Sequence, residues 1–477
     1  MARREIKLID EEREFDITEL FFSITDKKGI IEFGNDVFTR ISAYSEVELI
    51  NKPHNIIRHP DMPRAVFQLL WDYIQSGRLI AAYVKNLAKD GRYYWVMATV
   101  MPCEGGYVSI RLKPTTDYFN VVQVVYKEVL AVEQEIETGG GRRRDAIKAG
   151  IEATLKILAE NGFPDYDSFM QTAFLAEMFA RQKLCEQASQ PADGGLRVIT
   201  SDTDLSNRDP VVLDLFTVST QLNRELQQLF ISMDELNTLN SSLQGKASFV
   251  EELQKIIRLL AMNASVKACR LGDQGAPLRV VADVMSRKTN ENKAVMANLE
   301  QDVHHLEKYL KQLIFDIAVC KLQLEIVERF TIELLTAHDK IGAEGYVENR
   351  EELLKKSSVI LATLLDKKLS FCLGSLSELL EKLQSTSRLI EQLGCFTREL
   401  SLIHFTGKVE IAVIEEAASF SATFAEILRQ IERTETELKE FMDLIESSSS
   451  CVRNVNNHSS VIAERCKTLC QTASDWH

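Results

Sequence analysis

Apolar side chains recur every three or four residues through much of the second half of the chain, and this spacing limits what that half can fold into. One run of such positions extends from Leu222 to Val250, and a second, without error, from Met296 to Val327. Sustained spacing of this kind is typical of long helices that pair along an apolar seam. A segment rich in Gly and Pro, 271–277, separates the two runs. The pattern predicts an antiparallel coiled-coil hairpin over 211–345, with its tip near 272–277.

Further helices are predicted on both sides of this hairpin. A helical region over 349–477 is expected to comprise blocks at about 350–396 and 399–448 and a short final helix. Connecting helices are expected over 118–190, with a hinge at the Gly and Arg run 138–144. The Pro- and Gly-containing segment 191–210 is predicted to be a linker.

The first hundred residues have a different character, with most of the β-strand patterns of the chain. Residues 15–117 contain five short β-rich runs, and Asp90-Gly91 between two of them is a strong hairpin turn. Asp61, shortly before Pro63, is predicted to cap a helix that extends to about Ser76. We therefore expect a multidomain protein, with an N-terminal α+β domain and an all-α remainder of long helical hairpins.

Composition restricts the functional class. The chain has 477 residues and a net charge of −14, which disfavours binding to nucleic acid because phosphate contacts need clustered Lys and Arg. No apolar segment follows the first residues and no run of about eighteen apolar residues occurs, so neither a secretory signal nor a transmembrane helix is expected. The nine Cys form no CxxC motif, so no metal site is indicated. We expect a cytoplasmic protein with reduced thiols.

A resemblance to a known family is carried by the segment 34–44 and by the motif HNIIRHPDMP at 54–63. With Trp71, Val84-Lys85-Asn86 and Tyr94-Trp95-Val96 following in order, residues 15–117 resemble the PAS domain of bacterial aerotaxis receptors. That resemblance implies a cavity that holds FAD and reports redox state or oxygen. The positions of the family's flavin site fall here on Asn35, Arg58, His59, Asp61, Trp71 and Asn86.

The residues themselves allow several interpretations of this cavity. Arg58 can pair with phosphate and Trp71 can form a wall for a ring, but Arg58, His59 and Asp61 can equally form a local ion-pair and capping network. Compared with the family, aliphatic residues at Ile80 and Ala82 reduce the stacking area. A haem ligated by His54 or His59, another small ligand, or no cofactor at all therefore stay open as alternatives.

A second resemblance involves the predicted hairpin tip. Residues 259–283 are similar, without a gap, to the signalling tip of methyl-accepting chemotaxis proteins. In that family the tip contacts a histidine kinase and its coupling protein, and the hairpins dimerise. The resemblance implies a homodimer through the coiled coil and assigns partner binding to Asn263, Lys267, Arg270 and Asp273.

Several tip residues depart from the family. Lys267 reverses the charge of a family Glu, and Ala276-Pro277-Leu278 replaces Arg-Gly-Phe. A reversed charge repels a former partner, so a hairpin kept only for folding is the alternative. Residues 405–412 faintly echo 262–269, which a duplicated hairpin or chance would explain.

Together these features predict a chemotaxis-type sensory protein whose PAS domain senses redox, oxygen or a small ligand and modulates a helical signalling hairpin. The alternative is a non-catalytic scaffold or adaptor, derived from a chemoreceptor, that binds partners through its helices. No P-loop, GxSxG, HExxH, kinase or cyclase motif is found, so an enzyme is not expected.

Overall fold

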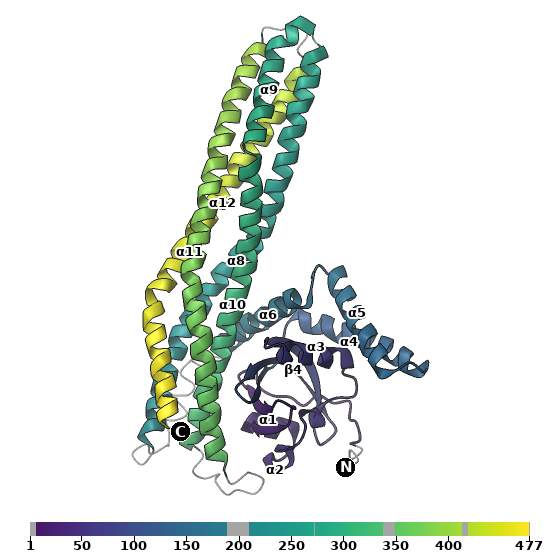
Figure 1. Cartoon of the computed structure of the whole chain (residues 1–477), viewed down its shortest axis with the longest axis vertical. Helices are drawn as coiled ribbons and strands as arrows, with labels where there is room; N and C mark the ends of the chain where they lie inside the picture. The colour runs from purple at the N-terminus through teal and green to yellow at the C-terminus, as the bar shows by residue number, and fades with distance from the viewer. Residues whose placement is uncertain (1–5, 188–208, 271, 337–348, 413–417, 477) are drawn as a thin grey trace. The chain divides into compact units, whose positions relative to one another are not determined.

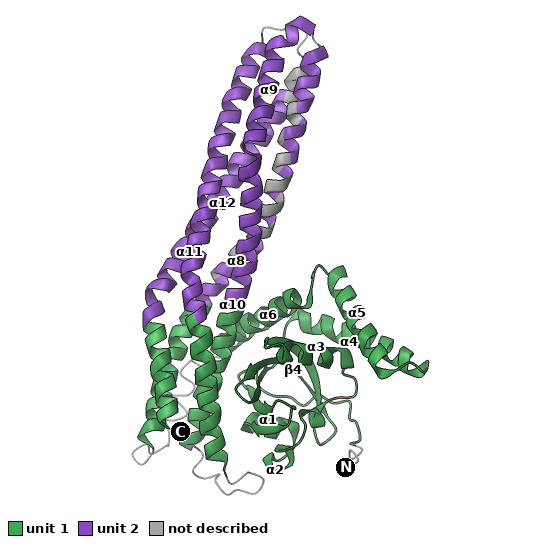
Figure 2. Cartoon of the chain, in the orientation of Figure 1, with its two compact units in different colours: residues 1–230, 315–370, 461–477 green, residues 231–314, 371–460 purple. Residues whose placement is uncertain are grey.

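The architecture comes from a computed structural model, which describes residues 6–187, 209–270, 272–336, 349–412 and 418–476 (Figure 1). The predicted linker 191–210 lies almost wholly outside the described residues. The chain divides into two compact units (Figure 2). Unit 1 comprises 1–230, 315–370 and 461–477, and unit 2 comprises 231–314 and 371–460.

A five-stranded antiparallel sheet forms the centre of the N-terminal domain in unit 1. Its strands are β1 (Phe21–Asp26), β2 (Ile31–Gly34), β3 (Ile80–Leu87), β4 (Tyr93–Cys103) and β5 (Gly106–Leu112). Their order in the sheet is β2-β1-β5-β4-β3. Gly91 between β3 and β4 has φ +97° and Gly105 between β4 and β5 has φ +88°, values that an L side chain rarely adopts, so both turns depend on glycine.

Short helices and one longer helix follow strand β2. They are α1 (Asp36–Ser42), α2 (Glu46–Leu49), the 3₁₀ helix η1 (His54–Ile57) and α3 (Arg64–Gln75). Helix α3 begins after Pro63 and not at the predicted Asp61 cap. The amides of Arg64 and Ala65 at its start donate instead to the carboxylate of Glu133, which lies far along the chain.

Three helices follow the last strand of the sheet. They are α4 (Asp117–Thr138), α5 (Arg143–Glu160) and α6 (Tyr166–Gln187). Helices α4 and α5 pack against each other, so the Gly run between them acts as a tight connection. Glu177 on α6 accepts hydrogen bonds from the amides of Thr115 and Thr116 at the start of α4 and from the hydroxyl of Tyr83 on β3.

The remainder is helical, as the sequence predicted. Its elements are α8 (Pro210–Arg270), the 3₁₀ helix η3 (Gly272–Gly275), α9 (Ala276–Glu291), α10 (Lys293–Thr336), α11 (Arg350–Ile411) and α12 (Ala418–Asp475). The predicted break near residue 397 does not exist, because α11 continues through it with Phe396, Thr397 and Leu400 buried. The Ser run 447–450 is likewise helical. The predicted fold class, a PAS-type α+β domain followed by long helices, is confirmed.

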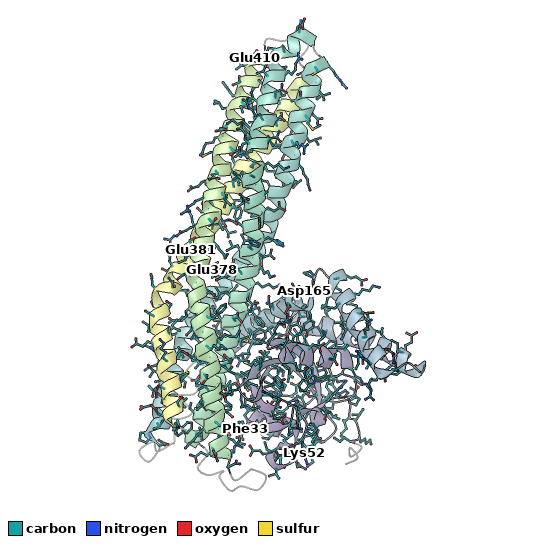
Figure 3. All side chains as sticks on the ribbon, in the orientation of Figure 1. Phe33, Lys52, Asp165, Glu378, Glu381 and Glu410 are labelled. Atoms are coloured by element: carbon teal, nitrogen blue, oxygen red, sulfur yellow. The ribbon has the colours of Figure 1, made fainter. Side chains whose placement is uncertain are left out.

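The apolar seams of these helices are buried within the chain. In unit 2, Lys246 on α8 pairs with Glu437 on α12 at 2.6 Å. The hydroxyl of Tyr309 on α10 donates at 3.0 Å to Glu378 on α11, which is labelled in Figure 3. In unit 1, Asn223 on α8 donates to Glu328 on α10 at 2.6 Å. The seam residues are thus covered by helices of the same chain. Among the described residues, no helix is long and apolar enough to cross a membrane.

Candidate functional site

A cavity of about 180 Å³ lies between the sheet and the helices of the N-terminal domain. Ser23 and Thr25 of β1 and Ser109 and Arg111 of β5 line it from the sheet, and residues of η1 and α3 line it from the opposite side. Side chains alternate between the two faces of a strand, so every second residue of β1 and β5 faces the cavity. β1 and β5 therefore supply polar groups to one wall, and α3 supplies apolar groups to the other.

Three of the predicted flavin-site residues line this cavity. Arg58 lies over the ring of Phe67 at 4.4 Å, and its Nη2 donates to the carbonyl oxygen of Met62 at 2.8 Å. Trp71 packs edge-on against Tyr107, with ring centroids 5.7 Å apart. The third residue, Asn86, is almost completely buried. The structure thus brings a cation, a large ring and an amide to one enclosed space.

The other three predicted residues do not line the cavity. Asn35 caps α1, because its Oδ1 accepts from the amide of Phe38 and its Nδ2 donates to the carbonyl oxygen of Leu20. Asp61 pairs with Lys85 at 2.8 Å, and Nδ1 of His59 accepts from the amide of Asp61 at 3.1 Å. This is the local ion-pair network that the sequence left open as an alternative. Their role in holding a cofactor stays a prediction.

An arginine that the sequence analysis missed is the most unusual group at the site. Arg111 is 4% exposed, and among the described residues no carboxylate lies within ion-pair distance of its guanidinium. Its Nη2 donates to Oγ of Ser23 at 2.8 Å and to Nε2 of His54 at 2.6 Å. Burial lowers the pKa of Arg111 to about 10, so the side chain is still protonated at neutral pH. A buried positive charge without a counter-ion favours a negative or electron-rich ligand.

His54 is held neutral by the same arrangement. Because the guanidinium can only donate, Nε2 of His54 accepts and the proton of the ring is on Nδ1. Burial and the charge of Arg111 together lower the pKa of His54 to about 3. The ring also stacks on Phe38, with centroids 5.8 Å apart. His54 therefore acts as an acceptor that orients Arg111.

Three buried polar atoms at the cavity have no hydrogen-bond partner in the described part of the chain. They are Nδ2 of Asn86, Oγ of Ser109 and Nη1 of Arg111. Two of them can only donate and the hydroxyl can also donate. An unsatisfied buried polar group costs about 1–3 kcal/mol, so three around one cavity indicate a ligand edge with several acceptors.

The sequence of β5 contains a pattern that indicates this polar wall of the cavity. Ser109 and Arg111 occupy alternate positions of a strand whose intervening residues, Val108, Ile110 and Leu112, are apolar. Polar residues with a period of two in an otherwise buried strand indicate one polar face. The absence of a carboxylate near Arg111 could not be predicted, because it depends on what surrounds the strand in space.

The donors at the cavity fit the ring of a flavin, whose pyrimidine edge carries carbonyl oxygens and ring nitrogens. Asn86, Ser109 and Arg111 would hold that edge, and the neighbouring Trp71 and Phe67 would contact the ring faces. The volume of the cavity is below the roughly 300–1,000 Å³ typical of small-molecule sites, so it suits the ring of a flavin, and the rest of an FAD molecule would have to lie outside the cavity.

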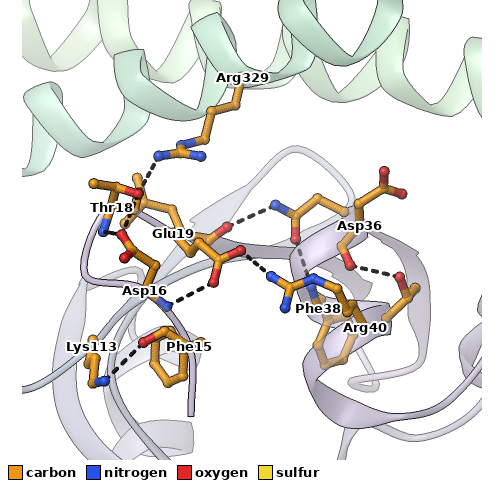
Figure 4. A network of polar contacts seen from close by, with 12 residues as sticks. Phe15, Asp16, Thr18, Glu19, Asp36, Phe38, Arg40, Lys113 and Arg329 are labelled. Carbon is orange, nitrogen blue, oxygen red and sulfur yellow. Dashed lines mark hydrogen bonds and ion pairs between the residues drawn. The ribbon is translucent and has the colours of Figure 1, made fainter. Parts of the chain in front are cut away.

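The opposite face of β1 contacts the helical part of unit 1. Phe22, on the face opposite Ser23, packs edge-on against Phe330 of α10 with ring centroids 4.9 Å apart. Phe33 of β2 contacts the same ring at 5.9 Å. Arg329, the neighbour of Phe330, donates to the carbonyl oxygen of Thr18 just before β1 (Figure 4). One strand therefore separates the cavity from α10.

Two buried ionic clusters join the same parts of unit 1. Arg350 at the start of α11 pairs with Asp36 and Glu46 of the N-terminal domain, each at 2.6 Å, and with Glu333 of α10. Arg181 on α6 pairs with Glu325 on α10 at 2.8 Å. Burial opposes ionisation of Glu325, but the nearby cations outweigh it and lower its pKa to about 2.

The predicted partner-binding residues lie around the turn of the first hairpin in unit 2. Asn263, Arg270 and Asp273 are exposed and Lys267 is partly exposed. Asn263, Lys267 and Arg270 are four and three residues apart, so they share one face of α8. The turn itself is η3, which lies within the predicted tip.

Comparison with known proteins defines the class of the N-terminal domain. Residues 31–108 match the family model of the PAS fold, so this domain is a PAS domain. The chain is 40% identical over 114 residues to the aerotaxis receptor of Escherichia coli, covering 23% of this chain and 22% of that protein. The predicted aerotaxis-receptor type of the PAS domain is confirmed.

Two further relatives match at 21% identity. The nitrogen fixation regulatory protein of Klebsiella pneumoniae matches over 173 residues, 36% of this chain and 34% of that protein. The biofilm dispersion protein BdlA of Pseudomonas aeruginosa matches over 335 residues, 54% of this chain and 78% of that protein. The chain thus spans about a fifth of the first relative's length and about a third of the second's.

Solved structures are similar to the PAS region. The PAS domain of a Colwellia psychrerythraea protein is 21% identical with a TM-score of 0.18, covering 20% of this chain and 85% of that chain. The light state of the blue-light photoreceptor Aureochrome1 LOV is 24% identical with a TM-score of 0.19, covering 24% of this chain and 91% of that chain.

Proposed function

We propose that this chain is a sensory signalling protein whose PAS cavity binds a small planar ligand and whose helical region responds to the occupied cavity. Relatives named as an aerotaxis receptor and a regulatory protein support the general class of PAS-containing sensory protein. The proposed stimulus is redox state, oxygen or a small metabolite. The chain acts without catalysis, because binding that favours one of two helix arrangements is sufficient for signalling.

The position of β1 carries this proposal. Ser23 and Thr25 face the cavity, while Phe22 between them faces Phe330 of α10. A ligand that binds to Arg111 changes the hydrogen bond between Arg111 and Ser23. Because β1 is closely packed, this change displaces the strand. The shift therefore reaches α10 through a single layer of protein.

Flavin is the cofactor that this chemistry supports best. The unsatisfied donors of Asn86 and Arg111 match the acceptors of a flavin edge, and the PAS domain is of the aerotaxis-receptor type. Haem is less well supported. His54 already uses Nε2 to accept from Arg111, and His59 does not line the cavity.

The proposed partners are a chemotaxis histidine kinase and its coupling protein, with the signalling reaction in the cytoplasm. The exposed residues Asn263, Arg270 and Asp273 around the turn support a docking role. A non-catalytic adaptor that binds other proteins through the same helices is the alternative function.

A spectroscopic titration tests the proposal. We expect the protein, purified or refolded with FAD, to show flavin absorbance near 450 nm. Asn86→Leu removes an amide whose Nδ2 has no partner among the described residues, so the variant should keep its stability and lose at least tenfold in flavin affinity. Amide exchange in residues 319–336 of α10 should slow on FAD addition in the wild type and not in the variant.

The matched control is Lys28→Gln, at the rim of the cavity and without a buried donor. It should leave FAD binding within about twofold of the wild type. A wild-type protein that takes up no FAD would refute the flavin assignment. Flavin binding without any change of exchange in α10 would refute the coupling.

A further inference from the structure

The cavity of the PAS domain is lined by cations, although the chain as a whole is acidic. Lys28, Arg58 and Arg111 line the cavity, and none of the lining residues that the structure describes is an Asp or a Glu. The net charge of the whole chain is −14. Charges of one sign around an enclosed space act together on whatever that space contains. The cavity therefore favours a ligand, or a state of a ligand, that carries negative charge.

The three cations of the cavity differ in how strongly solvent screens them. Lys28 is exposed, whereas Arg58 lies over the ring of Phe67 and donates to the carbonyl oxygen of Met62. Arg111 is 4% exposed, and its Nη1 has no hydrogen-bond partner in the described part of the chain. The interaction between two charges grows as the surrounding dielectric falls. A negative charge beside Arg111 is therefore stabilised more than one beside the exposed lysine.

The groups that surround Arg111 do not balance its charge. Its Nη2 donates to the hydroxyl of Ser23 and to Nε2 of His54, and both of these acceptors are neutral. Tyr94 lies on the same face of the sheet, and burial raises the pKa of its hydroxyl, so it keeps its proton at neutral pH. A ligand is therefore the group that can supply the opposite charge.

A flavin changes its charge when it is reduced, whereas its oxidised ring is neutral. Two electrons from an external reductant such as dithionite and one proton from water give a reduced ring with one negative charge on its pyrimidine side. The unsatisfied donors of Asn86 and Arg111 fit the acceptors of that side. The added charge thus falls beside the buried cation, and charge at this position is one way in which a protein tunes a flavin.

We propose that Arg111 makes the PAS cavity bind the reduced, anionic form of its flavin more tightly than the oxidised form. This inference rests on the proposed function, because it takes flavin as the ligand. Tighter binding of the reduced form raises the midpoint potential of the bound flavin above that of free flavin, since the potentials and the two affinities form one thermodynamic cycle. The reduced ring also competes more strongly for Arg111 against Ser23, so reduction is the change that displaces β1.

A redox titration of the full chain loaded with FAD, followed by flavin absorbance, tests this role. We expect the midpoint potential of the wild type to lie above that of free FAD. Arg111→Gln removes the charge and keeps an amide donor for His54. The ratio of reduced to oxidised affinity should fall at least about a hundredfold, which lowers the potential of a two-electron couple by about 60 mV. Arg111→Lys keeps the charge and should retain this ratio within about tenfold of the wild type.

The matched control is Lys28→Gln, which removes an exposed cation from the rim of the same cavity. Its affinity ratio should stay within about threefold of the wild type, because solvent screens the charge of Lys28. Titration with oxidised FAD shows that each variant is loaded, and circular dichroism shows that it is folded.

The outcomes separate this inference from the proposed function. A wild type that takes up no FAD would refute the flavin assignment and this inference together. A wild type that binds FAD with a midpoint potential at or below that of free FAD would overturn this inference alone. Equal potentials of the wild type and Arg111→Gln, or an equal loss in Arg111→Gln and Lys28→Gln, would likewise overturn only the role of Arg111. If Arg111→Gln bound no FAD, the potential of the wild type relative to free FAD would decide.

Discussion

A single buried arginine accounts for most of the chemistry that the cavity can offer. Arg111 keeps its proton although burial lowers its pKa, and it is supported by a hydroxyl, a neutral imidazole and the ring of Phe38 at 5.2 Å. These partners can hold a cation but cannot neutralise it. An acceptor from a ligand would add the missing interaction. Under the proposed function, ligand binding at the cavity would therefore depend on charge as well as on shape.

The neutral state of His54 makes stability depend on pH. The pKa of His54 is about 3 in the folded protein, whereas its ordinary value is 6.5. Below pH 6.5 the unfolded chain therefore binds a proton at His54 that the folded chain does not bind. The contribution of neutral His54 to the unfolding free energy is fully present above pH 6.5 and is lost as the pH falls toward 3. We expect His54→Gln, which keeps an acceptor for Arg111, to reduce the loss of unfolding free energy between pH 7 and 5 by about 1–2 kcal/mol.

Urea unfolding at several pH values measures this dependence. The exposed His305, changed to Gln, is the matched control and should leave the pH dependence as in the wild type. His59, whose pKa burial and Lys85 lower to about 4, contributes in the same direction, so some dependence should remain in the His54 variant. An identical pH profile for His54→Gln and the wild type would contradict this assignment.

At the scale of elements, helix ends in unit 1 are capped by residues from other helices. Glu133 of α4 accepts from the first amides of α3, at 2.9 and 2.7 Å, and is fully buried. Negative charge at a helix start is favourable because the free amides point toward it. We expect Glu133→Gln to lower the unfolding free energy by about 1–3 kcal/mol, because its amide group would face donors.

Thermal unfolding of this variant, followed by circular dichroism, checks the expectation. The exposed Glu135 lies on the same helix, and Glu135→Gln should change stability by less than about 0.5 kcal/mol. Equal effects of the two substitutions would show that the buried carboxylate does not cap α3.

The caps also show where prediction from sequence reaches its limit. Strand alternation, turn glycines and heptad spacing are local patterns, and they located the sheet and the long helices. Asp61 had the right residue type and spacing for a cap, yet Glu133, with no local sign of such a role, makes the contact. Similarly, HNIIRHPDMP located Arg58 at the cavity, but the lack of a carboxylate near Arg111 in the described part of the chain depends on distant residues. Local periodicity can be predicted from the sequence, whereas the pairing of side chains that are distant along the chain cannot.

At the scale of the whole molecule, unit 1 combines the PAS domain with the ends of the long helices. Phe330 lies against β1 and Arg350 lies among carboxylates from both parts. An apolar contact such as that of Phe330 can transmit a displacement. A buried ionic contact holds its elements in place, because separating the charges would leave each of them buried without an opposite charge. Under the proposed function, this combination would let the PAS domain move α10 without detaching from it.

Removal of the Arg350 ion cluster should therefore separate the PAS domain from the helices of unit 1. Arg350→Gln leaves Asp36, Glu46 and Glu333 without their shared cation, and Glu46 is only 1% exposed. Breaking a buried ion cluster typically costs about 3–5 kcal/mol, so we expect a lower urea midpoint and faster proteolytic release of the PAS domain. Lys356→Gln is the matched control, since its pair with Glu32 at 3.6 Å joins the same parts but is exposed and is worth at most about 1 kcal/mol. If both variants unfolded and were cleaved alike, Arg350 would not be the residue that holds the PAS domain to the helices, and the contact at Phe330 would have to do so alone.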